Sequence, residues 1–477
     1  MAYEAVIGLE IHVQLNAATK LFCDCPNRPG DDPNRNICPV CLWLPGVAPQ
    51  LSRTALEKGV LACLALNCTI QPESAFDQKV YYYPDLPKGY QLSQHHQPLA
   101  RDGWVEIIDA DNQLKRLRIH HIHLEEDVAK LVHETDGRTP ISLVDFNRAG
   151  TPLIEIVSEP DMRSPHDAMA YVKTLRAQLR YTGCAECSLE QGTLRVDANI
   201  SVRPRGSDQL NTKVEVKNMN SIRNVGDAIA YEIERQSACM EKGTPITLHT
   251  RLWDPDKRMT VPMRAKFEGP CIPDPSVARI VIDAPWLAEI KQRLPEMPAQ
   301  KIARFIKDFG LTPDEAAAMT AEREWATLFE ATSDHGLPPR KVANWISTRL
   351  IPVLRERRQS LQETRLSADR FAALLDLLEQ GTINAQAAKE VLPQLLDSDD
   401  PPETIVARGG FAQVSAGDEL EALVDRVIAQ HPADVQDFRN GNPKVLGFLM
   451  GQAMKASGGK ANPKRLKELL GTKLGAA

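Results

Sequence analysis

The chain has 477 residues, 43% hydrophobic and 25% charged, a composition typical of a folded protein with several cores, so we expect two to four domains. No run of about 18 apolar residues occurs, and no basic segment precedes an apolar one near residue 1, so we expect a cytoplasmic protein with no membrane partner. The net charge of -6 excludes a surface that is basic throughout, so a nucleic-acid partner would need a local basic patch.

Residues 1–290 are predicted to form strands and loops. Short alternating or β-branched runs such as YEAVIGLEIHVQL and TLRVDANISVRP are separated by Pro, Gly and Asn. Helical spacing of apolar residues appears at 53–66 and 165–181. The pattern predicts the α+β class, with a mainly antiparallel sheet in a cradle domain over 1–290.

Residues 291–405 are predicted to form an all-α domain. The sequence TPDE at 312–315 is typical of a helix N-cap with a first-turn proline and a capping-box glutamate. Apolar residues over 371–378 share one helical face. The acidic, proline-rich and then glycine-rich segment 397–410 is the best candidate for a linker, so we place the last domain boundary near 405.

Residues 406–477 are predicted to form a small, basic helical tail domain. Residues 431–477 hold eight Lys or Arg and three acids, a net charge of +5, so the rest of the chain carries -11. This asymmetry favours an anionic partner at the tail. A solvated amphipathic helix pair explains the charge equally well.

Four of the ten cysteines form a C-x-C-x12-C-x2-C pattern at Cys23, Cys25, Cys38 and Cys41. The pairs flank a segment rich in Pro, Gly, Asp and Asn, which can fold both pairs around one ion. This spacing predicts a structural zinc site with all four coordination positions filled.

Two polar arrays are candidate site residues. In GLEIHVQL, the strand period of two places Glu10 and His12 on the face opposite the leucine and isoleucine residues. In HHIHLEED, the side chains of His121, His123 and Glu125 share one face. Alternation alone favours a solvated face for the first array. Crowded carboxylates and imidazoles nevertheless favour a bound cation, and the oxygen ligands suit magnesium, which suggests phosphate chemistry.

A tyrosine-rich loop, FDQKVYYYPDLPKGYQLSQ, carries Lys79 and Lys88, which could bind phosphate or form a polar gate. The sequence contains neither a G-x4-G-K-[ST] phosphate-binding loop nor a G-x-S-x-G nucleophile motif. A hydrolytic serine therefore has no recognisable place in the chain.

Several long motifs together resemble the B subunits of the heterotrimeric aspartyl/glutamyl-tRNA amidotransferases. The resemblance runs nearly end to end and is less distinct over 290–405. It is carried by the tyrosine-rich loop above and by GLEIHVQL, HLEEDVAK, SLVDFNRAGTPLIEIVSEPD, GTLRVDANISVRP, TKVEVKNMNS and VLGFLMGQAMKASGGKANPK.

The resemblance implies a carbon-nitrogen ligase of translation that uses glutamine as amide donor. Such a subunit uses ATP and magnesium to phosphorylate the side-chain carboxylate of Glu-tRNA(Gln) or Asp-tRNA(Asn). Ammonia from an amidase-like A subunit, a glutaminase, then displaces the phosphate, and a small C subunit completes the heterotrimer. The basic tail would contact tRNA through Lys455, Lys460 and Lys464.

The resemblance also assigns residues to the reaction. Glu10, His12 and Glu125 match the positions that hold magnesium near the transferred phosphate, and Glu190 matches a further ligand. The four cysteines match a zinc knuckle that some family members carry.

Two lysines match polar positions associated with the path of ammonia. These are Lys79 and Lys88, and a contact between Lys88 and Glu125 would act as a gate.

Two departures from the family pattern concern the substrate pocket. One acid is missing where this chain has Glu190 and Gln191. Where family members carry a D-Y-R-Y-F-P motif, this chain reads FEGPCIPDP, so the segment 266–278 predicts a difference in rate or acceptor preference.

Two other functions compete with the amidotransferase. The first is a non-catalytic, zinc-containing tRNA-binding scaffold with solvated Glu and His faces. The second is a stand-alone metal-dependent hydrolase, which leaves the basic tail without a role.

Overall fold

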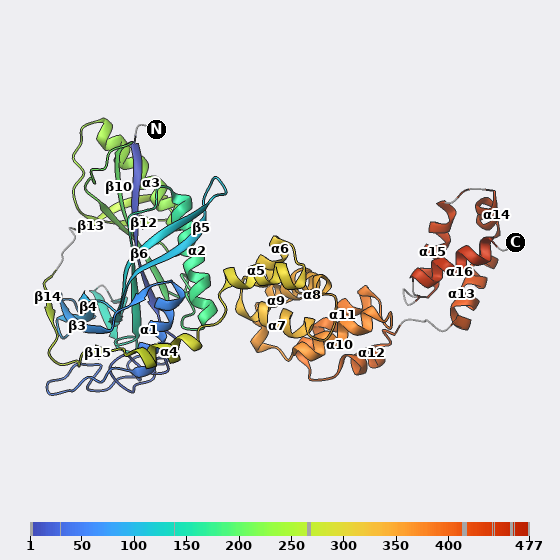
Figure 1. Ribbon diagram of the computed structural model, residues 1–477, viewed down its shortest axis with the longest axis horizontal. Coiled ribbons are helices and arrows are strands. Elements are labelled where there is room, and N and C mark those ends of the chain that lie inside the picture. Colours follow the sequence, from blue (N-terminus) through green and yellow to red (C-terminus); the bar gives the residue numbers. More distant parts are fainter. Residues whose placement is uncertain are drawn as a thin grey trace. The chain divides into compact units, whose positions relative to one another are not determined.

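The computed structural model describes residues 3–28, 30–137, 139–264, 269–412, 417–440, 442, 444–457, 461 and 463–475. The chain divides into two compact units, Met1–Met297 and Pro298–Ala477. The first unit is built on sheets and the second on helices, which confirms the α+β class (Figure 1). Among the described residues, no helix combines the length and apolar character needed to cross a membrane.

A nine-stranded sheet forms the frame of the first unit, with β1 (Tyr3–Gln14) at its centre. Neighbouring strands are antiparallel, except that β11 and β12 are parallel. The strand order is β13-β12-β11-β10-β1-β9-β6-β5-β2. The other strands are β2 (Thr69–Ile70), β5 (Ala100–Ile108), β6 (Leu114–Glu126), β9 (Pro152–Ser158), β10 (Leu194–Pro204), β11 (Val214–Lys217), β12 (Thr250–Asp254) and β13 (Met259–Arg264).

Two smaller sheets complete the strand structure of this unit. In the first, β3 pairs with β4, β14 and β15, and in the second β7 pairs with β8. Their bounds are β3 (Glu73–Val80), β4 (Tyr90–Gln97), β14 (Cys271–Pro273), β15 (Ile280–Val281), β7 (Lys130–Asp136) and β8 (Thr139–Asp145).

Three helices pack side by side against the large sheet: α1 (Arg53–Ala65), α2 (Pro165–Thr182) and α3 (Ile222–Glu241) (Figure 1). Serine side chains accept a hydrogen bond at the first turn of each helix. The apolar face of β1, with Leu9 and Ile11, is buried in the same core as Leu175 of α2. The polar face of β1 therefore points away from this core.

The sequence predicted α1 and α2 but missed α3. The buried face of α3 begins with apolar residues such as Val225 and Ile229, then continues with Glu232 and Gln236, both fully buried. Gln236 donates hydrogen bonds to the Ile200 carbonyl and to Glu232. Buried polar residues interrupt the apolar period, and the interruption hid the helix from pattern analysis.

The second unit begins with helices that confirm several local predictions. Thr312 and Glu315 form the expected capping box at the start of α6, and the face with Phe371, Leu374 and Leu375 is buried. The helices are α5 (Pro298–Phe309), α6 (Pro313–Met319), α7 (Arg323–Ser333), α8 (Pro339–Trp345), α9 (Ile351–Arg357), α10 (Ala368–Glu379), α11 (Ala385–Asp397) and α12 (Pro402–Gly409), while α4 (Ala284–Gln292) belongs to the first unit.

The predicted linker 397–410 is wrong in part, because most of it forms α12. Pro402 lies in the first turn of this helix, where a missing N–H costs nothing, and Ile405 and Val406 are buried. Gly410 ends the helix in the left-handed conformation (φ 60°). Proline and glycine therefore mark the two ends of a helix here.

The last helices form a small core of their own. They are α13 (Gly417–Gln430), α14 (Pro432–Arg439), α15 (Lys444–Ala456) and α16 (Pro463–Gly475). Val424, Leu449 and Leu470 are among the side chains that this core buries. The predicted division into 1–290, 291–405 and 406–477 stays a prediction.

Candidate active site

Polar side chains from three neighbouring strands meet on the polar face of the large sheet. The register places His12 of β1 opposite Glu155 of β9, and Glu155 opposite His123 of β6. Directly paired residues project to the same face, so these side chains and Glu125 lie together. His12 Nε2 is 3.3 Å from Glu125 Oε1 and 3.6 Å from Glu155 Oε2. This first set, His12, Glu125 and Glu155, has a geometry that could hold a metal ion.

A second acidic set lies beside the first. Glu10 of β1 pairs in register with Asp197 of β10, and oxygens of these two residues and of Glu215 on β11 all lie within 4.8 Å of one another. Lys217 forms ion pairs with Asp197 and, at 3.6 Å, with Glu215. Asn199 Nδ2 donates to Glu10 Oε1 at 2.9 Å. Three carboxylates this close together repel one another, so a cation is favoured here as well.

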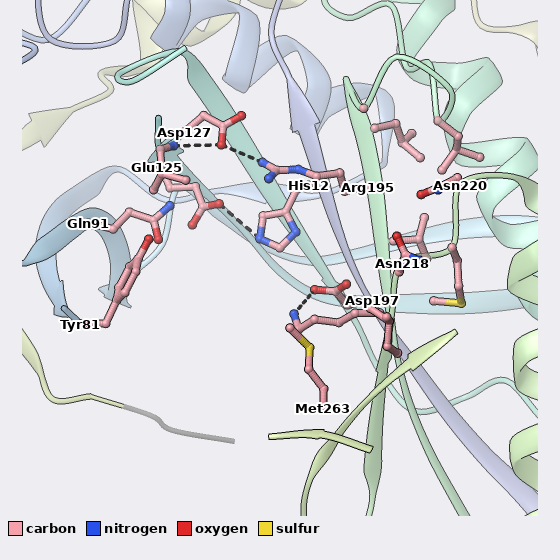
Figure 2. A pocket seen from close by; sticks show the side chains of 18 residues that line it. His12, Tyr81, Gln91, Glu125, Asp127, Arg195, Asp197, Asn218, Asn220 and Met263 are labelled. Carbon is pink, nitrogen blue, oxygen red and sulfur yellow. Dashed lines mark hydrogen bonds and ion pairs between the residues drawn. The ribbon is translucent and has the colours of Figure 1, made fainter. Parts of the chain in front are cut away.

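His12 and Glu125 of the first set and Asp197 of the second line one pocket of about 460 Å³. This volume is in the range of small-molecule sites. Figure 2 shows Tyr81, Gln91 and Glu125 on one side of the pocket, with Asn218, Asn220 and Met263 on the other. Further lining residues include His12, Asp127, Leu189, Gly192, Arg195, Asp197, Met219 and Lys217.

Burial and charge work against each other in the first set. Burial alone would lower the pKa of His123, but the Glu155 and Glu125 carboxylates outweigh it and raise that pKa to about 9. Burial likewise opposes ionisation of Glu155, but His12 and His123 hold its pKa well below the ordinary range. Lys79 is affected in the same way, since the carboxylates outweigh burial and raise its pKa. These groups are therefore ionised together.

Glu125 is buried at the pocket wall, with its side chain only 1% exposed to solvent. Neither of its oxygens accepts a hydrogen bond from the described residues. The imidazoles of His12 and His123 approach them at 3.3 and 3.7 Å without hydrogen-bond geometry. A buried carboxylate without donors is costly, so its position favours a bound cation.

Asp127 connects the two sides of the pocket. Its Oδ1 accepts a hydrogen bond from Arg195 at 3.0 Å (Figure 2). Its Oδ2 accepts one from Gln14 at 2.9 Å. Gln14 and Arg195 lie on adjacent strands, β1 and β10. The carboxylate therefore ties the end of β6 to the centre of the sheet.

The predicted contact between Lys88 and Glu125 is wrong, because Lys88 forms an ion pair with Glu126. Side chains alternate along β6, so Glu125 projects toward the pocket while Glu126 projects to the opposite side. The Lys88 and Glu126 side chains are 5% and 3% exposed. Burial lowers the pKa of Lys88, although the Glu126 carboxylate acts to raise it.

The structure brings His12 and Glu125 together, whereas Glu10 lies in the second set and Glu190 in neither. Glu190 is exposed in a turn and belongs to neither acidic set. Sequence reasoning missed Glu155, Asp197 and Glu215. Glu155 lies in PLIEIVS and Asp197 in LRVDANISVRP, each the only acid of its strand, and that pattern was the available signal.

Cys23, Cys25, Cys38 and Cys41 do come together, with their sulfur atoms within 4.8 Å of one another. The Cys38 N–H donates to Cys41 Sγ at 3.1 Å. A hydrogen bond from Cys23 lowers the pKa of Cys41 to about 5, and the same bond, with burial, raises the pKa of Cys23. Thiols this crowded share protons unless a cation replaces them, which fits a metal-binding knuckle.

The tail lysines are described only in part. Lys455 is exposed near the end of α15, whereas Lys460 and the side chain of Lys464 lie outside the described residues. Lys473 donates to both Asp425 oxygens at 2.7 Å, so α13 neutralises one of the basic groups of the tail.

Of the divergent segment 266–278, residues 266–268 lie outside the described residues, and part of the rest pairs with the strand that carries Lys79. Within it, Cys271 of β14 pairs in register with Lys79 of β3. Asp274 Oδ1 accepts hydrogen bonds from the Ser276 and Val277 N–H groups, both at 2.8 Å. Asp274 therefore closes a turn.

The sequence that forms this fold and pocket matches a known class of catalytic domain. Residues 5–288 match a family model described as the GatB/GatE catalytic domain, and residues 327–474 match one described as the GatB domain.

Full-length relatives narrow the assignment. The chain is 62% identical to a B subunit, numbered 1, of the aspartyl/glutamyl-tRNA(Asn/Gln) amidotransferase of Syntrophus aciditrophicus, with 100% of both chains covered. It is 46% identical to the corresponding B subunit of Carboxydothermus hydrogenoformans, with 99% of both chains covered, and 45% identical to that of Thermodesulfovibrio yellowstonii, with 98% of this chain and 99% of the relative covered. The chain belongs to the family of aspartyl/glutamyl-tRNA(Asn/Gln) amidotransferase B subunits, which confirms the resemblance seen in its motifs.

The raised pKa of His123 predicts a pH-dependent stability of the metal-free protein. With a folded-state pKa of about 9, the ionised imidazole stabilises the fold fully below pH 6.5, and this contribution is lost as pH rises through 9. The loss amounts to about 3 kcal/mol at about 1.4 kcal/mol per pKa unit. Urea unfolding of the wild type at pH 6 and pH 10 should show this decrease, and His123→Gln should reduce it. His133→Gln, at an exposed histidine, should leave it unchanged. An equal decrease in wild type and His123→Gln would contradict the assignment.

Proposed function

We propose that this chain is the activating and amidating subunit of an RNA-dependent amidotransferase. It phosphorylates the side-chain carboxylate of Glu-tRNA(Gln) or Asp-tRNA(Asn) with ATP, releasing ADP. Ammonia then attacks the acyl phosphate, phosphate leaves, and Gln-tRNA(Gln) or Asn-tRNA(Asn) results. The observation that carries the proposal is a pocket lined by members of two acidic sets, His12 and Glu125 of the first and Asp197 of the second, in a chain that belongs to this family throughout its length.

The residues of both sets fit magnesium. Carboxylate oxygens are the ligands that magnesium prefers, and the Glu125 oxygens lack hydrogen-bond donors among the described residues. His12 and Glu125, with Glu155, would hold an ion at the first set, and Glu10, with Asp197 and Glu215, would hold one at the second. A bound magnesium ion reduces the repulsion between the substrate carboxylate and the transferring phosphate.

Lys79 and Lys88 have different places in this proposal. Lys79 keeps its charge beside the carboxylates of the first set, so it can bind an anionic oxygen of the substrate or of phosphate. Lys88 and Glu126 form a buried pair away from the pocket, which fits a gate on the path of ammonia. The gate that we propose therefore uses Glu126 in place of Glu125.

In this proposal, partner chains supply the ammonia. The sequence has no serine nucleophile motif for hydrolysing glutamine, so a glutaminase A subunit must supply ammonia, with a small C subunit completing the complex. A non-catalytic scaffold would not explain why both sets contain buried carboxylates, because burying like charges together is costly.

Removing any one magnesium ligand should abolish most of the activity. Glu10→Ala, His12→Ala and Glu125→Ala should each lower the rates of phosphorylation and transamidation by about 100-fold or more, as expected for loss of a key electrostatic contact. ADP release and amidated tRNA are measured in the complex with its partner subunits. Basal glutaminase activity should persist, and Glu106→Ala, at a half-exposed glutamate on β5, is the matched control. Near-normal phosphorylation by all three variants would refute the assignment.

The cysteine knuckle should bind one zinc ion per chain with a structural role. Apparent binding free energies of about 10 to 16 kcal/mol are typical of such sites, so replacing Cys23 or Cys41 by Ser should release zinc and loosen the knuckle. Metal analysis and thiol titration measure this. Cys239→Ser should keep the full zinc content. A purified protein without zinc, with all four thiols titratable in the folded state, would contradict the site.

The basic tail should contribute phosphate contacts to tRNA. Replacing Lys455, Lys460 and Lys464 together by Gln should weaken tRNA binding and lower the slope of its salt dependence by up to about three, since each phosphate contact contributes about one. The control replaces Lys291, Lys307 and Lys389, exposed lysines outside the tail. Unchanged affinity and slope in the tail variant would favour a solvated surface.

A further inference from the structure

Trp43 stands at the end of the cysteine knuckle, two residues after Cys41. Its φ of 51° lies in the left-handed region, which a bulky side chain rarely adopts. A tight turn holds it there, because the Trp43 N–H donates to the Val40 carbonyl at 2.8 Å and the Leu42 N–H to the Cys38 carbonyl at 3.1 Å. The turn that presents two of the cysteines therefore also fixes the indole.

The Trp43 indole covers the buried ion pair formed by Lys88 and Glu126. Lys88 Nζ lies 3.5 Å from the centroid of the indole and 4.9 Å from that of Tyr90. The indole packs edge to face against Tyr90, with centroids 5.8 Å apart, and against Phe22 at 6.2 Å. A buried ammonium above an aromatic face is attracted most strongly where water is excluded.

We propose that metal binding to the cysteine knuckle holds Trp43 over Lys88, so that Trp43 is a positioning residue that keeps the Lys88 and Glu126 pair away from water. This inference rests on the zinc site of the proposed function. The metal would join the two cysteine pairs and so prevent the turn after Cys38 from relaxing. Without that cross-link, Trp43 is free to leave its disfavoured backbone conformation, and the indole would no longer cover the ammonium.

A reciprocal effect follows from thermodynamic linkage. If metal binding favours the covered state of Lys88, then stabilising contacts of the indole must favour metal binding by the same factor. Trp43→Ala should therefore weaken zinc binding as well as expose Lys88. Trp43→Phe retains an aromatic face and should retain most of both effects.

Acylation of lysines with a small, water-soluble acetylating reagent tests the inference, with the modification of Lys88 read by peptide mass spectrometry. In the zinc-loaded complex, Lys88 should react at least tenfold more slowly than after chelation of zinc. Zinc-loaded Trp43→Ala should react as fast as the chelated wild type, and chelation should add little to it. Trp104→Ala is the matched control, because that indole lies 4.0 Å from the Arg116 guanidinium on the exposed end of the hairpin of β5 and β6.

The outcomes separate this inference from the proposals on which it depends. Equal reactivity of Lys88 before and after chelation of a zinc-loaded protein, or continued protection in zinc-loaded Trp43→Ala, would overturn the role of Trp43 alone. Exposure of Lys88 in Trp104→Ala to the same extent would also overturn it. Absence of zinc from the purified complex would refute the zinc site. The acylation measurement itself does not depend on phosphoryl transfer.

Discussion

The crowding of carboxylates on one face of a sheet is the constraint on which the rest of the structure depends. The antiparallel register of β1 with β9 and β10 places acids of adjacent strands directly opposite each other or opposite histidine. Such an arrangement is stable only if cations lie among the acids. The histidines and Lys217 supply part of the charge, and the remaining acidity is the basis of the divalent-ion site that we propose.

The large sheet can tolerate this crowding because its other face is apolar. Leu9 and Ile11 of β1 are buried against the helices, so the strand is held in place without help from its polar side. The burial of apolar area stabilises the sheet, and this offsets the repulsion between the carboxylates on its opposite face. A site of this kind keeps its geometry before any ion or substrate arrives, which favours catalysis by preorganised charge.

The cysteine knuckle of the same unit is held in place in a different way. It has little apolar core of its own, so polar anchors hold it, such as the hydrogen bond from the Asn36 N–H to Asn147 Oδ1 at 2.8 Å. The metal that we propose for the knuckle would add a cross-link that a short loop cannot supply through packing. Through Trp43 the loop also reaches Lys88, so the stability of a peripheral element and the environment of a buried lysine are connected.

The sequence by itself determined the features that depend on local spacing. These are the α+β class, the polar face of β1, the cysteine pairs and the capping box at Thr312, because each is set by a period or a turn of a few residues. Tertiary structure alone decided which distant acids meet. Glu155 and Asp197 are each the only acid of their strand, and only the pairing of β1 with both neighbours brings them to His12 and Glu10. The partner of Lys88 was decided in the same way, since adjacent glutamates on β6 project to opposite faces and only the packing of β4 against β6 selects Glu126.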